Sequence, residues 1–139
     1  SLDLKLQMLV YPATDASKYY ESFSENKDGP LLTVEVIEWF WSHYLGKATG
    51  DEVRNDWRFS PAKAASHNGV APSYIATCSA DPLRDEGNAY AAQLSEAGVN
   101  VQHSMFEGQP HILFQLFNIC EGGKDLIDEC AAALDKAFG

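Results

Sequence analysis

Short apolar segments alternate with longer amphipathic ones along this chain, and stretches rich in polar residues, Gly and Pro separate them. Residues 4–11 (LKLQMLVY) are apolar on both faces toward their end and stop at Pro12, which predicts a short buried strand. Residues 74–78 (YIATC) predict a second buried strand, because they are partly β-branched and aromatic. Apolar positions alternate in residues 99–106 (VNVQHSMF), which predicts a third strand near the edge of a sheet.

Three further segments have the apolar spacing of helices. Thr33 is a suitable N-cap for a helix that runs to about Leu45. Residues 84–97 predict a second helix, because acidic residues occupy the first turn, good helix formers follow, and a glycine comes after the last turn. Residues 124–138 predict a third helix, whose apolar residues recur every three or four positions. The residues expected to face the core from this last helix are Ile127, Ala131, Leu134 and Phe138.

The order of these elements predicts an α/β fold. Strands alternate with helices, as in a parallel sheet with right-handed crossovers, and no repeat or low-complexity stretch divides the chain. Residues 12–30 and 51–72 predict long irregular connections, and Gly108 is expected to open a further loop after the third strand. Parallel sheets normally have several neighbouring strands, so about three parallel strands with flanking helices indicate that part of the sheet is missing.

Composition and charge exclude several classes of partner. A hydrophobic share of 45% in 139 residues is enough for one domain with a buried core. The net charge of −10 comes from 20 acidic and 10 basic residues without a basic run, which excludes nucleic acid and anionic membrane surfaces as partners. No apolar stretch approaches the roughly 20 residues that span a bilayer, and no leader opens the chain, so we expect a soluble protein.

The cysteines indicate a reducing environment. The chain has three of them, Cys78, Cys120 and Cys130, and no C-x-x-C pair. An odd number without paired spacing fits neither a disulfide framework nor a zinc site, and no cluster of His, Cys and acidic residues has the spacing of metal ligands. We therefore expect unpaired cysteines that pack as small apolar residues, and a cytoplasmic protein.

Asp81 and His111 are the candidate catalytic residues, because each comes shortly after a predicted strand. In sheets of this kind, catalytic groups gather at the carboxyl ends of the strands, so the two side chains are expected on neighbouring loops at the same rim. A carboxylate there fixes the tautomer of the imidazole and stabilises the imidazolium that forms when histidine takes a proton from a nucleophile. The pair therefore supplies two thirds of a Ser-His-Asp triad.

Structural alternatives exist for each of these acidic and histidine residues. Asp81 precedes a proline, and aspartate in that position is common in turns and at helix N-termini. His111 is alternatively a loop histidine packed beside Phe114. Asp85 and Glu86 resemble a carboxylate pair for acid–base work, but we expect them to favour the positive end of the helix that follows.

A longer motif surrounds Asp81. Residues 81–87 (DPLRDEG), followed by 90–94 (YAAQL) and 97–99 (AGV), resemble the segment after the penultimate strand in bacterial-type esterases of the hormone-sensitive lipase family. The resemblance covers nearly the whole chain, and it implies an α/β-hydrolase fold in which Asp81 is the triad acid and His111, by its position, the base. Further matching segments are residues 9–12 (LVYP), 29–33 (GPLLT), 39–41 (WFW) and 60–61 (SP).

The chain departs from the family pattern in two respects. The family usually places Gly-Phe after its histidine, whereas Ile112 follows His111 here. The oxyanion loop and the Gly-x-Ser-x-Gly nucleophile elbow, which precede the first strand of this chain in the family, are also missing. None of the eleven serines has glycine two residues before and two after it. Residues 1–139 are therefore expected to be the C-terminal half of an α/β-hydrolase catalytic domain, and the start at Ser1 suggests truncation.

The resemblance implies that the intact enzyme is a serine carboxylesterase acting on short or medium acyl esters without a cofactor. The chain alone lacks a nucleophile, so we expect no triad-type turnover from it. The alternative is a non-catalytic truncated module. Without the preceding strand, the edge of residues 4–11 has unpaired backbone groups, which favour self-association or pairing with the missing N-terminal half.

Overall fold

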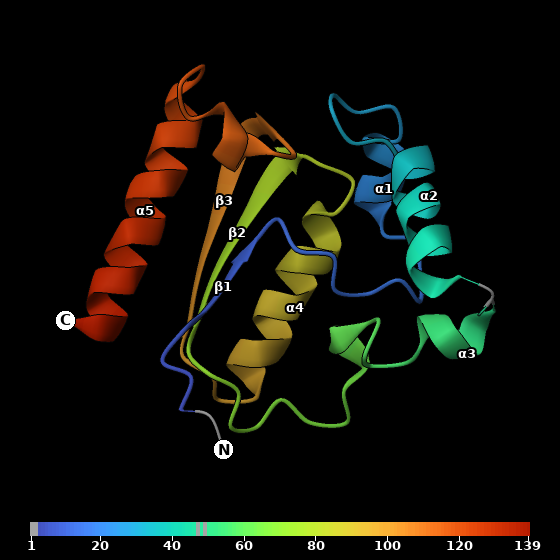
Figure 1. Cartoon of the computed structure of the whole chain (residues 1–139), viewed down its shortest axis with the longest axis horizontal. Helices are drawn as coiled ribbons and strands as arrows, with labels where there is room; N and C mark the ends of the chain where they lie inside the picture. The colour runs from blue at the N-terminus through green and yellow to red at the C-terminus, as the bar shows by residue number, and fades with distance from the viewer. Residues whose placement is uncertain (1–2, 47, 49) are drawn as a thin grey trace.

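The centre of the molecule is a parallel sheet (Figure 1). The computed structural model describes residues 3–46, 48 and 50–139, so Ser1 lies outside the described residues. The strands are β1 (Gln7–Val10), β2 (Ser73–Ala80) and β3 (Val101–Pro110), in the spatial order β1-β2-β3. Both pairings are parallel, with Gln7 opposite Ser73 and Ser73 opposite Val101. The predicted α/β class with three parallel strands is confirmed.

The middle strand β2 is buried on both faces, as its apolar sequence predicts. Tyr74, Ala76 and Cys78 pack with Leu126 and other residues of the helix α5 (Glu121–Phe138). Ile75 points to the other face, where it packs with residues of α4 (Arg84–Glu96), among them Tyr90 and Leu94. The sheet therefore lies between two helices, which Figure 1 shows on opposite sides of it.

The end of β3 differs from the prediction. The strand continues through Gly108 to Pro110, although Gly108 was expected to open a loop. Opposite Ser79, β3 carries the extra residues of a bulge, because Cys78 pairs with Phe106 and Ala80 with Pro110. Gly108 has a φ of 69°, and its N–H donates to Ser79 Oγ at 2.6 Å. The glycine is therefore part of a bulge within the strand, and His111 follows directly after the end of this strand.

Helix α5 also differs from the prediction, in its start and in the face that it buries. It begins at Glu121, three residues before the predicted start. Its buried residues are Gly123, Leu126, Cys130 and Ala133, whereas Leu134 and Phe138 are 44% and 70% exposed. The buried stripe is thus the neighbouring one on the helix. A Cβ on Gly123 would lie 2.8 Å from the Phe117 backbone, so the glycine lets this face approach the preceding segment.

The long connection between β1 and β2 forms the remaining part of the fold. It contains α1 (Glu21–Glu25), α2 (Val34–Leu45), α3 (Asp51–Arg54) and a 3₁₀ turn, η1 (Pro61–Lys63). Only α2 was predicted; its Thr33 cap is confirmed, since Thr33 Oγ1 accepts from the Val36 N–H at 3.2 Å. The other elements have at most five residues, which is too short for a helical repeat to show in the sequence. Across the described residues, no helix combines the length and apolar content that crossing a membrane requires.

Candidate active site

Asp81 lies directly after β2 at the carboxyl end of the sheet, with none of its surface exposed. One carboxylate oxygen, Oδ1, accepts from the Leu83 N–H at 2.9 Å, as in an Asx turn. The other, Oδ2, accepts from His111 Nδ1 at 2.7 Å. The turn role and the predicted contact with histidine therefore occur together, because each uses a different oxygen.

His111 follows β3 directly and reaches Asp81 from the neighbouring strand end. Because a carboxylate only accepts hydrogen bonds, Nδ1 carries the proton and Nε2 is the nitrogen with a lone pair. The side chain is 17% exposed and lines a pocket. The imidazole is thus fixed in the tautomer that a general base requires, and it borders a space that a substrate can enter.

The pocket beside His111 has a volume of about 400 Å³. Most of its lining residues belong to the connection between β1 and β2, and many of these are apolar or aromatic. Leu83 and Glu86, at the start of α4, line the pocket as well. Such a cavity, with a few polar groups among apolar walls, suits a small organic ligand. The lining residues include Ala13, Thr14, Asp15, Ala16, Leu32, Ile37, Phe40, Trp41, Tyr44, Arg58, Phe59, Leu83 and Glu86.

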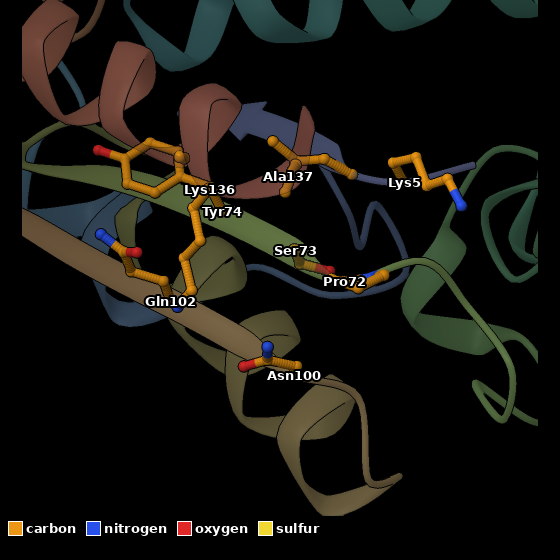
Figure 2. A pocket seen from close by; sticks show the side chains of 10 residues that line it. Lys5, Pro72, Ser73, Tyr74, Asn100, Gln102, Lys136 and Ala137 are labelled. Atoms are coloured by element: carbon orange, nitrogen blue, oxygen red, sulfur yellow. The ribbon is translucent and has the colours of Figure 1, made fainter. Parts of the chain in front are cut away.

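A second pocket, of about 250 Å³, lies at the opposite end of the sheet (Figure 2). It is lined by Ser73 and Gln102 near the amino ends of β2 and β3. Its described lining residues include two lysines, Lys5 and Lys136, but neither an acid nor a histidine. Ligands in open α/β sheets bind at the carboxyl ends of the strands, so the pocket at His111 is the candidate active site.

Comparisons with known proteins agree with this geometry. A sequence model of the α/β-hydrolase fold matches residues 1–115 of the chain. The chain belongs to the α/β-hydrolase family. This α/β hydrolase is 38% identical to ethyl acetate hydrolase of Pseudomonas putida over 117 residues, which are 84% of this chain and 36% of that protein. It is 39% identical to carboxylesterase NlhH of Mycobacterium tuberculosis over 136 residues, which are 97% of this chain and 42% of that protein.

Solved structures show the same relationship. An ester hydrolase from the metagenome of Lake Arreo, complexed with a bipyridine phosphonate derivative, matches with a TM-score of 0.90 and 37% identity. The match covers 97% of this α/β hydrolase and 42% of that chain. The chain therefore spans less than half the length of each of these relatives. The resemblance to esterases of the hormone-sensitive lipase family is confirmed.

The acidic residues that follow Asp81 in this α/β hydrolase connect distant segments. Asp85 accepts from the Ser22 N–H at 2.9 Å, at the start of α1. Glu86 is 1% exposed, and its Oε1 accepts from the N–H groups of Thr14 and Asp15 at 2.5 and 3.2 Å. Both acids lie in the first turn of α4, as predicted, and the contacts to distant segments come in addition to that position. Sequence reasoning missed the role of Glu86, because nothing in the local pattern distinguishes it from Asp85.

Glu86 is expected to make the stability of this α/β hydrolase depend on pH. Burial raises the pKa of Glu86 from 4.5 to about 7. The folded state then binds the proton more tightly than the unfolded state, so this contribution to stability is complete below pH 4.5 and is lost as pH rises through 7. Between pH 4.5 and pH values above 7, the free energy of unfolding should fall by about 3 kcal/mol through this group.

Glu86→Gln removes this titration, so its free energy of unfolding should fall less between pH 4.5 and 7 than that of the wild type. Urea unfolding at several pH values measures the difference. Glu96→Gln, on the exposed face of the same helix, is the matched control and should follow the wild-type curve. Parallel curves for the wild type and Glu86→Gln would contradict the expectation.

Proposed function

We propose that residues 1–139 are the C-terminal half of a serine-dependent carboxylic ester hydrolase and supply its acid, Asp81, and its base, His111. The observation that carries the proposal is the 2.7 Å hydrogen bond between Asp81 Oδ2 and Nδ1 of His111, which lines a pocket. The carboxylesterase relatives support ester hydrolysis at the level of the family. We call the enzyme that combines this chain with its nucleophile half the intact esterase.

In the proposed reaction, His111 Nε2 removes the proton from a serine hydroxyl as the serine oxygen attacks the ester carbonyl carbon. The imidazolium that forms donates from Nδ1 to the Asp81 carboxylate, which stabilises the new charge. When the tetrahedral intermediate collapses, Nε2 returns the proton to the leaving alcohol. Water then attacks the acyl-enzyme, with His111 again acting as base, and releases the carboxylic acid and the free serine.

The nucleophile in this proposal comes from outside the chain. No serine has the Gly-x-Ser-x-Gly context of a nucleophile elbow. Cys78 lies on β2 near Asp81, but burial and the charge of Asp81 raise the pKa of its thiol to about 12. A thiol with that pKa is protonated at neutral pH and is a poor nucleophile. A serine on a preceding segment is therefore the proposed reactant.

Short or medium acyl esters are the proposed substrates. The pocket volume of about 400 Å³ accommodates a small acyl or alcohol group, and its apolar walls exclude water from such a group. Phe40, Trp41 and Phe59 supply aromatic surface there. Ethyl acetate hydrolase, a relative at 38% identity, carries the name of a small ester.

The proposed partner is the N-terminal half, which pairs with the open edge of β1. Within the described residues, β1 pairs with β2 alone, so its other edge has free backbone groups. Leu134 and Phe138 on α5 add exposed apolar surface. The alternative function, a non-catalytic module that self-associates, rests on the same edge. A cytoplasmic location, based on the unpaired cysteines, stays a prediction.

Complementation tests the proposed function. The chain alone should hydrolyse no p-nitrophenyl acetate above background, and mixing it with an N-terminal half that carries the nucleophile elbow should restore turnover. The matched control is the same N-terminal half with the elbow serine replaced by alanine. Hydrolysis by the chain alone that disappears in His111→Ala would contradict the proposal, and a stable self-associated chain that never pairs would favour the alternative.

A further inference from the structure

Tyr11 lies at the point where β1 leaves the sheet. Its N–H donates to the Ala76 carbonyl at 2.7 Å, which extends the pairing of β1 with β2 by one residue. Its φ is 39°, in the left-handed region that aromatic residues rarely adopt. Such a conformation persists only where the surrounding contacts hold it in place. The side-chain contacts of Tyr11 are therefore expected to hold this conformation.

The side chain of Tyr11 contacts the histidine segment at two places. Its ring centroid lies 4.4 Å from that of His111, with the planes at 57°. Its hydroxyl donates to Gln115 Oε1 at 2.7 Å. Gln115 belongs to the 3₁₀ turn η2 (Leu113–Leu116), so Tyr11 holds both the imidazole and the turn that follows it.

The segment between these two contacts is strained. Ile112 separates His111 from η2 and has a φ of 60°, which is unfavourable for a β-branched residue. The bond to Asp81 holds Nδ1 of the imidazole, and the Tyr11 ring is a second contact of the same imidazole. The Tyr11 ring packs against the imidazole, and its hydroxyl bond to Gln115 connects it to η2 beyond the strained residue.

We propose that Tyr11 is a positioning residue, which holds the His111 imidazole so that Nδ1 faces Asp81 while Nε2 faces the substrate. Its kinetic consequence rests on the proposed esterase function, whereas its geometric consequence does not. Tyr11 acts through His111, so its loss should impair the chemical step and leave substrate binding intact.

Kinetics of the intact esterase test this proposal. Tyr11→Phe keeps the ring but loses the hydroxyl bond to Gln115, and kcat should fall about 3- to 10-fold. Tyr11→Leu loses the aromatic ring as well, and kcat should fall on the order of 100-fold. KM should stay within about twofold in both variants. Tyr74→Phe is the matched control: it loses a hydroxyl bond to Glu129 at 2.9 Å, far from His111, and should keep the wild-type kcat.

The low-field proton resonance of His111 Nδ1–H provides a readout that does not need turnover. In protein with isotope-labelled histidine, this resonance should be sharp in the wild type. It should be broadened or lost in Tyr11→Leu, while the rest of the spectrum is retained. A persistent sharp resonance in folded Tyr11→Leu would overturn the proposal. Unchanged kcat in Tyr11→Phe would also overturn it, whether or not Tyr11→Leu folds. If the wild-type chain combined with its N-terminal half had no esterase activity, the proposed function would be refuted. The resonance would still test the role of Tyr11.

Discussion

Replacing His111 by alanine in the intact esterase is expected to lower kcat on the order of 10⁴-fold or more. The variant removes the nitrogen that takes the serine proton, and the Asp81 carboxylate cannot replace it because it is fully buried. Steady-state hydrolysis of p-nitrophenyl acetate measures the loss. The protein should remain folded, because the side chain is 17% exposed and the substitution removes one hydrogen bond, to Asp81.

Asp81→Asn separates tautomer control from proton transfer. The amide has the shape of the carboxylate, but its NH₂ group favours a lone pair on His111 Nδ1 and places the proton on Nε2. We expect kcat to fall about 10⁴-fold, because the nitrogen facing the serine then has no lone pair. Asp85→Asn, four residues later, is the matched control: its carboxylate contacts Ser22 and Arg84, and a loss of at most a few-fold is expected. Similar losses in both variants would contradict a specific role for Asp81.

Replacing Leu126 by alanine is expected to destabilise the 139-residue chain by about 2–5 kcal/mol. Leu126 is fully buried in the cluster that joins α5 to the sheet, and its neighbours there include Tyr74, Leu113 and Cys130. Truncation leaves a cavity among these side chains that the packed sheet cannot collapse to fill. Urea unfolding followed by circular dichroism measures the change in the free energy of unfolding.

Leu134→Ala is the matched control on the same helix. The substitution is identical, but Leu134 is 44% exposed, so the expected loss is below about 1 kcal/mol. The pair also distinguishes the observed orientation of α5 from the predicted one, which placed Leu134 in the core. A larger loss for Leu134→Ala than for Leu126→Ala would show that the helix buries the other face.

The sheet and the contact between Asp81 and His111 could be predicted from the sequence, because both depend on the order of elements along the chain. The strands are apolar segments between clear breakers, and residues that follow parallel strands meet at the same rim. Asp81 and His111 therefore come together without any knowledge of side-chain packing. The family motif around Asp81 gave the same assignment independently.

The orientation of α5 could not be predicted in this way. Two neighbouring stripes of the helix are both apolar at helical spacing, and the hydrophobic pattern alone does not rank them. The choice depends on the close approach of Gly123 to Phe117, which is a tertiary contact. The contacts of Tyr11 and Glu86 are likewise invisible in the sequence, because their partners lie 104 and 72 positions away in Gln115 and Thr14.

The aromatic wall of the pocket belongs to a core of its own. Phe23, Ile37 and Trp41 pack together with Leu83 in a cluster distinct from the two that cover the sheet. Mutations in this cluster can remodel the cavity while the strands that carry Asp81 and His111 keep their packing. In the proposed intact esterase, directed evolution of ester preference should therefore accumulate its changes in residues 12–72, where substitutions leave the contact between Asp81 and His111 intact more readily than substitutions in β2 do.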